Sequence, residues 1–175
     1  MIVKPSRAAE LSEGRAHERI GKKDMAMSDA AVAARMRLED QICFAVHATA
    51  HAFAQAYKPL LAPLRLTYPQ YLVMLLLWEK DNRSVGELGG PLFLDSGTLS
   101  PLLKRLQGLG YVSRSVDPAD ERVTRIALTR QGAALRDKAA AIPQAMLGSM
   151  NLDLGELASL REQVKRLGAA LRETG

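Results

Sequence analysis

Apolar residues recur at helical spacing in the first well-patterned stretch of the chain, from about residue 35 to residue 61. Its apolar positions are Leu38, Ile42, Val46, Phe53, Tyr57 and Leu60. This spacing predicts a helix of about seven turns. Pro59 and Pro63 mark where the helix must kink or end. Thr67-Tyr68-Pro69 predicts the cap and first turn of a following helix. The apolar run to Trp78 in that helix predicts burial on almost every side.

Two shorter helices are predicted next. Ser84-Val85-Gly86-Glu87-Leu88 opens the first, and Asp95-Ser96-Gly97-Thr98 caps the second, which Gly108 and Gly110 bring to an end. The second helix places leucines inward and basic residues outward. Its inward positions are Leu99, Leu102, Leu103 and Leu106, and its outward ones are Lys104 and Arg105.

The pattern then changes to alternation, which predicts a β-hairpin. Residues 112–116 alternate as a strand, 117–122 form a polar turn, and 123–128 form the return strand. Helix, short helix, capped helix and hairpin, in this order, make a helix-turn-helix with a wing. The fold class expected is therefore mainly α with a small β-hairpin wing.

Helical spacing returns after the hairpin. Thr129 is expected to cap a long helix reaching about Met150, with a kink at Pro143. Asp153 begins a final helix with an apolar stripe, at Leu154, Leu157, Leu160, Val164, Leu167 and Leu171. Residues 1–33 are rich in Ala, Ser, Gly and charge, and we expect a flexible tail there. Residues 34–175 are expected to form one domain.

Composition narrows the classes of protein only modestly. A hydrophobic content of 47% is enough for a core, and the net charge of +5 permits a nucleic-acid partner without requiring one. Charges interrupt the N-terminus, so no signal peptide is expected, and the apolar run 71–78 is too short to span a bilayer. We expect a cytoplasmic protein. Three scattered histidines and one cysteine predict no metal site and no cofactor.

The second helix of the helix-turn-helix carries residues suited to DNA contacts. The first turn of a helix in the major groove lies at the base edges, and later basic residues reach phosphates. The candidates are Ser96, Thr98, Ser100, Pro101, Lys104 and Arg105, with Asp120 and Arg122 in the hairpin. Arg122 is expected to enter a minor groove. The plainer alternatives are that Ser96 only caps the helix and that Arg122 is a solvated turn residue.

Several motifs in the chain resemble the MarR family of winged-helix repressors. They are Leu66-Thr-Tyr-Pro-Gln-Tyr-Leu72, Leu94-Asp-Ser-Gly-Thr-Leu-Ser-Pro-Leu-Leu-Lys-Arg-Leu106 and Asp120-Glu-Arg122. Cys43-Phe44 and Tyr57-Lys-Pro-Leu60 narrow the resemblance to the family's organic hydroperoxide resistance regulators. It implies a homodimer on a pseudo-palindromic operator, not an enzyme. It also implies dimerisation helices at about 35–62 and 129–173, and a winged helix-turn-helix at about 67–128.

Cys43 is the chain's single cysteine, so it is either an inert small hydrophobe or a reactive thiol. The resemblance implies a sensor that organic hydroperoxides oxidise, and Tyr57 and Tyr68 of the partner subunit as hydrogen-bond partners of the thiol. On one helix Tyr57 lies about 21 Å along the axis from Cys43, which is consistent with contact from a partner. With no second cysteine, the family's one-cysteine route is implied: a mixed disulfide with a low-molecular-weight thiol, or further oxidation.

Two positions depart from the family pattern. His47 replaces a usual tyrosine one turn after Cys43, where it would either stabilise the thiolate or be a partly exposed surface residue. Gly89-Gly90-Pro91 replaces ordinary helix formers, and because Gly and Pro weaken a helix by about 1 and 3 kcal/mol, a shortened or kinked helix is expected. An alternative function remains: a MarR-type repressor released by a small aromatic ligand at the dimer interface, with Cys43 inert.

Overall fold

The computed structural model describes residues 36–173 of the chain. The tail predicted for residues 1–33 lies outside the described residues. The chain divides into two compact units, Met1–His51 and Ala52–Gly175, and the boundary falls within one helix, α3. The second unit carries every element predicted for the winged helix-turn-helix.

The first long helix begins later than its apolar spacing predicts. Leu38–Asp40 form a separate 3-10 turn (η1), and the extended backbone of Gln41 separates it from α3, Ile42–Leu61. The start predicted near residue 35 is therefore wrong. Leu38, whose spacing suggested the longer helix, is 62% exposed and contributes no burial that would hold a further turn. The end is as predicted: α3 stops between the two prolines, and Pro63 lies in the next 3-10 turn, η2 (Ala62–Leu64).

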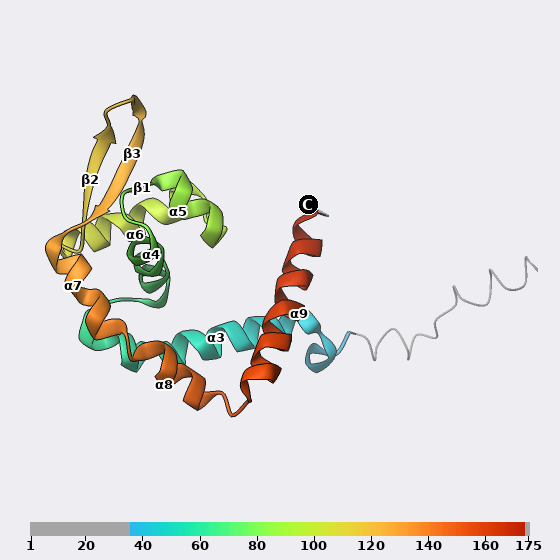
Figure 1. The fold of residues 1–175 in the computed structure, drawn as a ribbon. Helices are drawn as coiled ribbons and strands as arrows, with labels where there is room; N and C mark the ends of the chain where they lie inside the picture. Colours follow the sequence, from blue (N-terminus) through green and yellow to red (C-terminus); the bar gives the residue numbers. More distant parts are fainter. Residues whose placement is uncertain (1–35, 174–175) are drawn as a thin grey trace, which may run out of the picture. The chain divides into compact units, whose positions relative to one another are not determined.

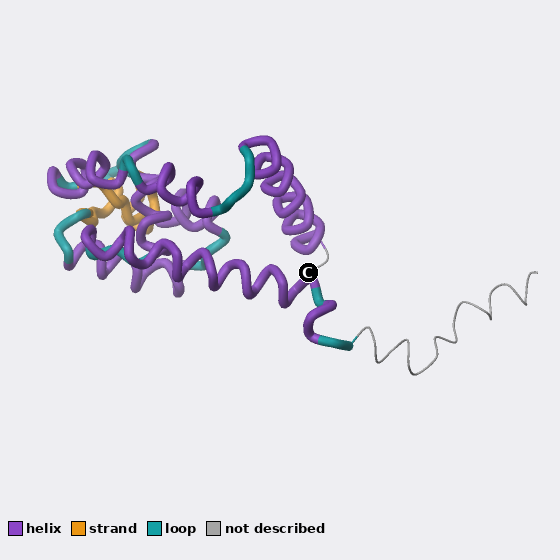
Figure 2. Tube along the Cα trace, turned by 90° about the horizontal axis from the view of Figure 1, so that it is seen from below, coloured by secondary structure: helices purple, strands orange, loops and turns teal. Residues whose placement is uncertain are grey.

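The winged helix-turn-helix follows in the expected order (Figure 1). Its helices are α4 (Tyr68–Glu79), α5 (Val85–Leu92) and α6 (Ser96–Gly108), and its strands are β1 (Arg83–Ser84), β2 (Val112–Asp117) and β3 (Asp120–Leu128). The strands form one small antiparallel sheet of order β1-β3-β2 in an otherwise helical unit (Figure 2). The predicted hairpin therefore gains a third strand. β1 has two residues, too few to show an alternating pattern.

The core of this unit lies between α4, α6 and the sheet. Leu99, Leu103 and Leu106 of α6 are fully buried, together with Met74 of α4 and Ile126 of β3. Leu102 is only half-buried. The expectation that α4 is buried on almost every side is wrong in part, because Leu75 is 40% exposed.

The Gly89-Gly90-Pro91 run does not shorten α5. The helix includes all three residues and reaches Leu92, and Phe93 caps it in the left-handed conformation with φ 54°. Gly89 is required by packing, since a Cβ there would lie 2.6 Å from the carbonyl oxygen of Leu94. That carbonyl belongs to the tight turn that leads into α6. The glycine therefore allows the two helices of the motif to approach closely.

The long helix predicted after the hairpin is two helices. Thr129 caps α7 (Arg130–Ala139) as predicted, with its hydroxyl accepting from the backbone N–H of Gly132 at 3.0 Å. The chain then breaks, and α8 (Ile142–Ser149) starts anew with Pro143 in its first turn, where a missing N–H costs nothing. The kink expected at Pro143 is thus a break just before it.

The final helix, α9 (Leu154–Glu173), begins at the predicted cap: Asp153 and Glu156 exchange side-chain-to-backbone hydrogen bonds of 2.8 and 2.9 Å. No residue of α9 is buried, and Leu154, Leu160, Val164, Leu167 and Leu171 are exposed. Within the described part of the chain no single helix is long and apolar enough to cross a membrane. The segments Ile42–Leu64 and Tyr68–Glu79 would be long and apolar enough only if taken together as one bent span, and only by length and composition.

Candidate nucleic-acid interface

The first turn of α6 is fixed by Asp95. Its Oδ1 accepts from the backbone N–H of Thr98 at 2.7 Å, and the Thr98 hydroxyl donates to Oδ2 at 3.2 Å. The hydrogen bond from the Thr98 backbone is the main cause that lowers the pKa of Asp95. Asp95 is therefore the cap, and the plainer alternative, in which Ser96 only caps the helix, is wrong. Ser96 is exposed at the first helical position, where it can meet a partner.

The outward face of α6 carries most of the residues predicted to contact DNA. Those exposed there are Ser96, Thr98, Pro101, Lys104 and Arg105, while Ser100 is half-buried. The buried leucines on the opposite face hold the helix against the core. This arrangement presents short polar side chains at the N-terminal end of the helix and two cations one to two turns later.

The wing brings Asp120 and Arg122 together. β3 begins at Asp120, directly after the short Pro118-Ala119 connection, so Arg122 is the third residue of the strand and does not lie in the predicted polar turn. Nε and Nη2 of Arg122 donate to the two carboxylate oxygens of Asp120, each at 3.0 Å. This pairing lowers the pKa of Asp120 and raises the pKa of Arg122. The Arg122 side chain is nevertheless 90% exposed, so an oriented cation projects from the wing.

Arg125 makes ion pairs beside this interface that the sequence patterns did not reveal. It lies in the middle of β3, opposite Ser84 of β1 and Ser115 of β2. Its guanidinium pairs with Asp117 at 2.5 Å and with Glu87 at 3.0 Å. In the sequence, the only sign of a role for Arg125 was its charge next to the buried Ile126. The alternating pattern of the strand did not indicate which residues Arg125 would pair with.

The two tyrosines predicted to support the thiol, Tyr57 and Tyr68, pack against each other. The ring centroids of Tyr57 and Tyr68 are 4.6 Å apart, and Tyr71, which was not predicted, lies 5.8 Å from Tyr57. The Tyr71 ring in turn meets the edge of Trp78 at 6.2 Å. Burial raises the pKa of all three phenols, and the neighbouring hydroxyls add to the effect at Tyr57 and Tyr71. No spacing in the sequence indicated that Tyr71 belongs to this cluster.

Cys43 lies in the first turn of α3 and is exposed. His47, one turn later, is also exposed. The apolar neighbours Ile42, Phe44 and Val46 are 66%, 39% and 41% exposed. The thiol belongs to the first compact unit and the tyrosines to the second. Their pairing stays a prediction.

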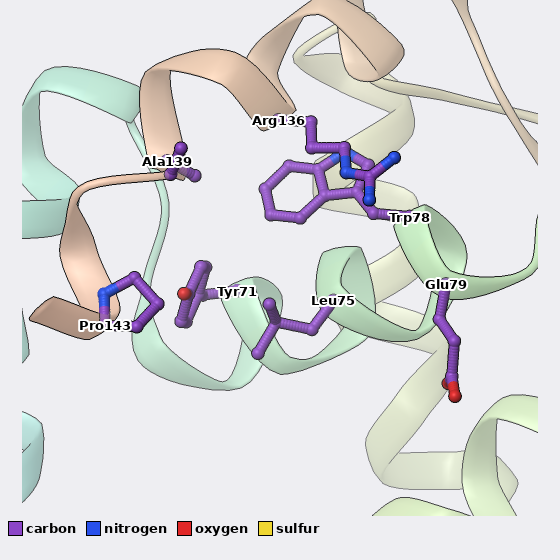
Figure 3. A pocket seen from close by; sticks show the side chains of 8 residues that line it. Tyr71, Leu75, Trp78, Glu79, Arg136, Ala139 and Pro143 are labelled. Atoms are coloured by element: carbon purple, nitrogen blue, oxygen red, sulfur yellow. The ribbon is translucent and has the colours of Figure 1, made fainter.

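An open pocket of about 360 Å³ lies between α4 and the α7–α8 segment. Its lining residues are Tyr71, Leu75, Trp78, Glu79, Arg136, Ala139, Ala140 and Pro143. Figure 3 shows that the rings and the leucine come from α4, while Arg136 and the small residues come from the other side. Trp78 is held by a hydrogen bond from its Nε1 to the Gly132 carbonyl at 2.9 Å. Across the described residues, no group of three or more acidic, His or Cys side chains could hold a metal ion.

Comparison with known proteins places this arrangement in a class. The family model for the transcriptional regulator SarA/Rot matches residues 55–139. The HTH-type transcriptional regulator TtmR of Methylorubrum extorquens is 50% identical over 134 residues, which cover 73% of this chain and 69% of TtmR. The organic hydroperoxide resistance transcriptional regulator of Bacillus subtilis is 42% identical over 138 residues, which cover 79% of this chain and 94% of that protein.

The fold is also shared with AbfR of Staphylococcus epidermidis. The structure of reduced AbfR bound to DNA has a TM-score of 0.69 and 33% sequence identity, over 79% of this chain and 95% of AbfR. AbfR has also been solved overoxidized on DNA (TM-score 0.61) and with a disulfide formed (TM-score 0.55).

The fold and the basic, capped α6 beside a wing define a winged-helix DNA-binding protein. With the relatives above, the chain belongs to the MarR family of winged-helix transcriptional regulators. It is a DNA-binding transcriptional regulator of that type.

Proposed function

We propose that the protein is a homodimeric repressor that releases its operator when an organic hydroperoxide oxidises Cys43. The observation that carries the proposal is the place of Cys43: an exposed thiol on a stretch of α3 that also exposes large apolar side chains. The similarity to an organic hydroperoxide resistance regulator supports the choice of oxidant.

A second copy of the chain accounts for the uncovered apolar surface. Large apolar side chains of α3 and α9 are exposed in one chain; those of α3 are Ile42, Phe44 and Val46. Interfaces of obligate dimers are rich in such apolar surface. We therefore assign dimerisation to helices within about 35–62 and 129–173, and DNA reading to about 67–128. In the dimer, Tyr57 and Tyr68 of one subunit are proposed to hydrogen-bond the Cys43 thiol of the other, with His47 beside it.

DNA binding is assigned to α6 and the wing. An α-helix fits the major groove, and a two-fold dimer places one such helix in each half of a pseudo-palindromic operator. Ser96, Thr98 and Ser100 would face the base edges, with Pro101 keeping that turn rigid. Lys104 and Arg105 would meet phosphates, and Arg122, oriented by Asp120, would enter the minor groove. A role on chromosomal DNA would place the protein in the cytoplasm.

The proposed switch is the oxidation of one sulfur, followed by its condensation with a small thiol. The thiolate of Cys43 attacks the peroxide oxygen; an S–O bond forms, the O–O bond breaks, and an alcohol leaves after protonation, so that sulfur is oxidised to sulfenic acid. A low-molecular-weight thiol then displaces the hydroxyl as water and leaves a mixed disulfide. Because overoxidized AbfR is found on DNA, we assign operator release to the bulkier mixed disulfide and not to further oxidation.

The test is operator binding by wild type and by Cys43→Ser, with and without cumene hydroperoxide in the presence of a small thiol. We expect the variant to bind its operator within about twofold of wild type, because serine is close in size. Peroxide should release the wild type and leave the variant bound. Mass spectrometry of the treated wild type should show the added thiol on Cys43. Release of the variant by peroxide would refute the sensing role.

The pocket beside α4 favours one alternative: a repressor released by a small aromatic acid. Its volume is within the range of ligand sites, two aromatic rings line it, and Arg136 offers a carboxylate partner. Salicylate should then release wild type and Cys43→Ser alike, and Arg136→Ala should abolish that response. If salicylate has no effect at millimolar concentration while peroxide acts, the alternative fails.

A further inference from the structure

We infer that Arg125 is a positioning residue that locks the wing to α5 and thereby sets where Arg122 meets DNA. The inference rests on the wing contact proposed above for Arg122. Arg125 joins three parts of the DNA-reading unit: the end of β2, the first turn of α5, and the loop before β1. Arg125 lies outside the motifs that carry the resemblance to the MarR family.

The guanidinium of Arg125 is held from three sides. Nε donates to Oδ2 of Asp117 at 2.5 Å, and Nη1 donates to Oε2 of Glu87 at 3.0 Å and to the carbonyl of Asn82 at 3.3 Å. Asp117 ends β2, and its side chain is only 13% exposed. Glu87 belongs to α5, where its carboxylate also accepts from the backbone N–H of Ser84 at 2.7 Å. One side chain therefore connects the base of the wing's turn to the helix cap of α5.

The same loop is tied to β3 a second time. Asp81 accepts from the backbone N–H of Leu128 at 2.8 Å, and Asn82 adopts the left-handed conformation that turns its carbonyl toward Arg125. Hydrogen bonds from Arg125 and Leu128 thus hold two points of β3 against the loop. Since Arg125 and Arg122 are three residues apart on one strand, fixing the first constrains the direction of the second.

Arg125 is poorly suited to contact DNA itself. Two carboxylates neutralise its charge, and its side chain is 32% exposed, against 90% for Arg122. The pKa of Asp117 is lowered first by the backbone N–H of Ala119 and next by the hydrogen bond from Arg125. The pKa of Glu87 is lowered mainly by its hydrogen bonds with Ser84, and the charge of Arg125 adds a smaller effect. Loss of Arg125 should therefore act on affinity through the geometry of the wing.

A double-mutant cycle on operator binding tests this role. Arg125→Ala and Arg122→Ala are each expected to weaken binding by about tenfold, in the range of a single lost arginine contact. The double variant should bind the operator no more than about twofold more weakly than Arg122→Ala. Once the Arg122 side chain is absent, a change in the position of the wing has no DNA contact left to weaken. Arg130→Ala, which removes an exposed arginine beyond the opposite end of β3, controls for net charge and should bind like wild type.

Glu87→Gln separates the ion pair from the helix cap. Glutamine can still accept from the Ser84 N–H in a capping box, so α5 keeps its start while the charge partner of Arg125 is lost. Binding should fall by about threefold to fivefold with an unchanged melting temperature, about the effect of one weakened ion pair. This variant keeps the test valid if Arg125→Ala fails to fold.

Hydrogen exchange of the wing separates failure of the inference from failure of the Arg122 contact. Arg125→Ala should speed exchange of the β2 and β3 amides, and Arg122→Ala should not. Additive losses in the cycle, wild-type affinity of Arg125→Ala, or unchanged exchange would each overturn the inference. If the Arg122→Ala variant binds the operator like wild type, the proposed minor-groove contact is wrong. Faster amide hydrogen exchange in Arg125→Ala would in that case still support the locking of the wing by Arg125.

Discussion

The phenol rings of Tyr57, Tyr68 and Tyr71 form a packed cluster in the second unit, and the pKa of each is raised. The centroid of the Tyr57 ring lies 4.6 Å from that of Tyr68 and 5.8 Å from that of Tyr71, and burial disfavours the ionised form of all three. Neutral phenols keep a hydrogen to donate, which is what a thiolate from a partner subunit requires. The cluster is thus suited to the role proposed for Tyr57 and Tyr68.

An alkaline titration tests the state of these phenols. Because folding raises their pKa above the ordinary 10.0, the protonated form favours the folded state. That contribution is complete below pH 10 and is lost as the pH rises through the raised values. Absorbance near 295 nm should therefore show their ionisation above about pH 10, and the free energy of unfolding should fall over the same range.

Tyr68→Phe provides the control for this titration. Phenylalanine keeps the ring contact with Tyr57 but has no proton to lose, so the fall in stability above about pH 10 should be smaller. Ionisation of the cluster below about pH 10 in wild type would contradict the raised pKa of these residues.

At the scale of elements, the close approach of α5 and α6 depends on a residue type that weakens helices. Gly89 lies inside α5, but the Leu94 carbonyl occupies the space that a side chain would need. A Cβ added at the neighbouring Gly90 would meet no atom within 4 Å outside its own stretch of helix. The two glycines therefore differ sharply in what they contribute.

Substituting alanine at each glycine should give opposite results. Gly89→Ala forces the tight turn to shift, and we expect the free energy of unfolding to drop by about 1–3 kcal/mol. Gly90→Ala adds a methyl group in open space and removes backbone freedom from the unfolded chain, so a gain of about 0.5–1 kcal/mol is expected. Urea denaturation of both variants measures the difference. Equal stability of the two would mean that packing against Leu94 is unimportant.

At the scale of the whole molecule, α9 carries five large apolar residues that are exposed in the single chain. Four of them, Leu160, Val164, Leu167 and Leu171, lie along one side of the helix, since their spacing alternates between four and three residues. The opposite side holds charged and small residues such as Ala169. A surface of this kind is stable in water when a second copy covers it.

Placing a charge on this stripe should separate the subunits. Val164→Glu puts a carboxylate in the centre of the proposed interface, where desolvation of an unpaired charge is costly. Sedimentation equilibrium should show a shift toward monomer at micromolar concentration, with operator binding weakened at least about tenfold, because two linked half-site contacts bind more tightly than one. Ala169→Glu adds the same charge on the opposite side and should stay dimeric. A dimeric Val164→Glu would exclude the stripe from the interface.

The sequence alone determined the elements whose hydrogen bonds close within a few residues. Asp95 caps α6 and Thr129 caps α7 through partners three residues away. The apolar spacing of α6 and α9 and the alternation of the wing are likewise local. The family motifs added the expected set of contact residues at α6 and in the wing, because those side chains are placed by the same short-range elements.

Only the tertiary structure decided what depends on residues far apart in the chain. Arg125 pairs with Glu87 across 38 positions, and Trp78 donates to the Gly132 carbonyl across 54. β1 is a strand only because β3 pairs with it, and Gly89 is tolerated in α5 because the turn into α6 fills its open side. Periodicity records which face of an element is apolar, but it carries no information about which distant group that face will meet.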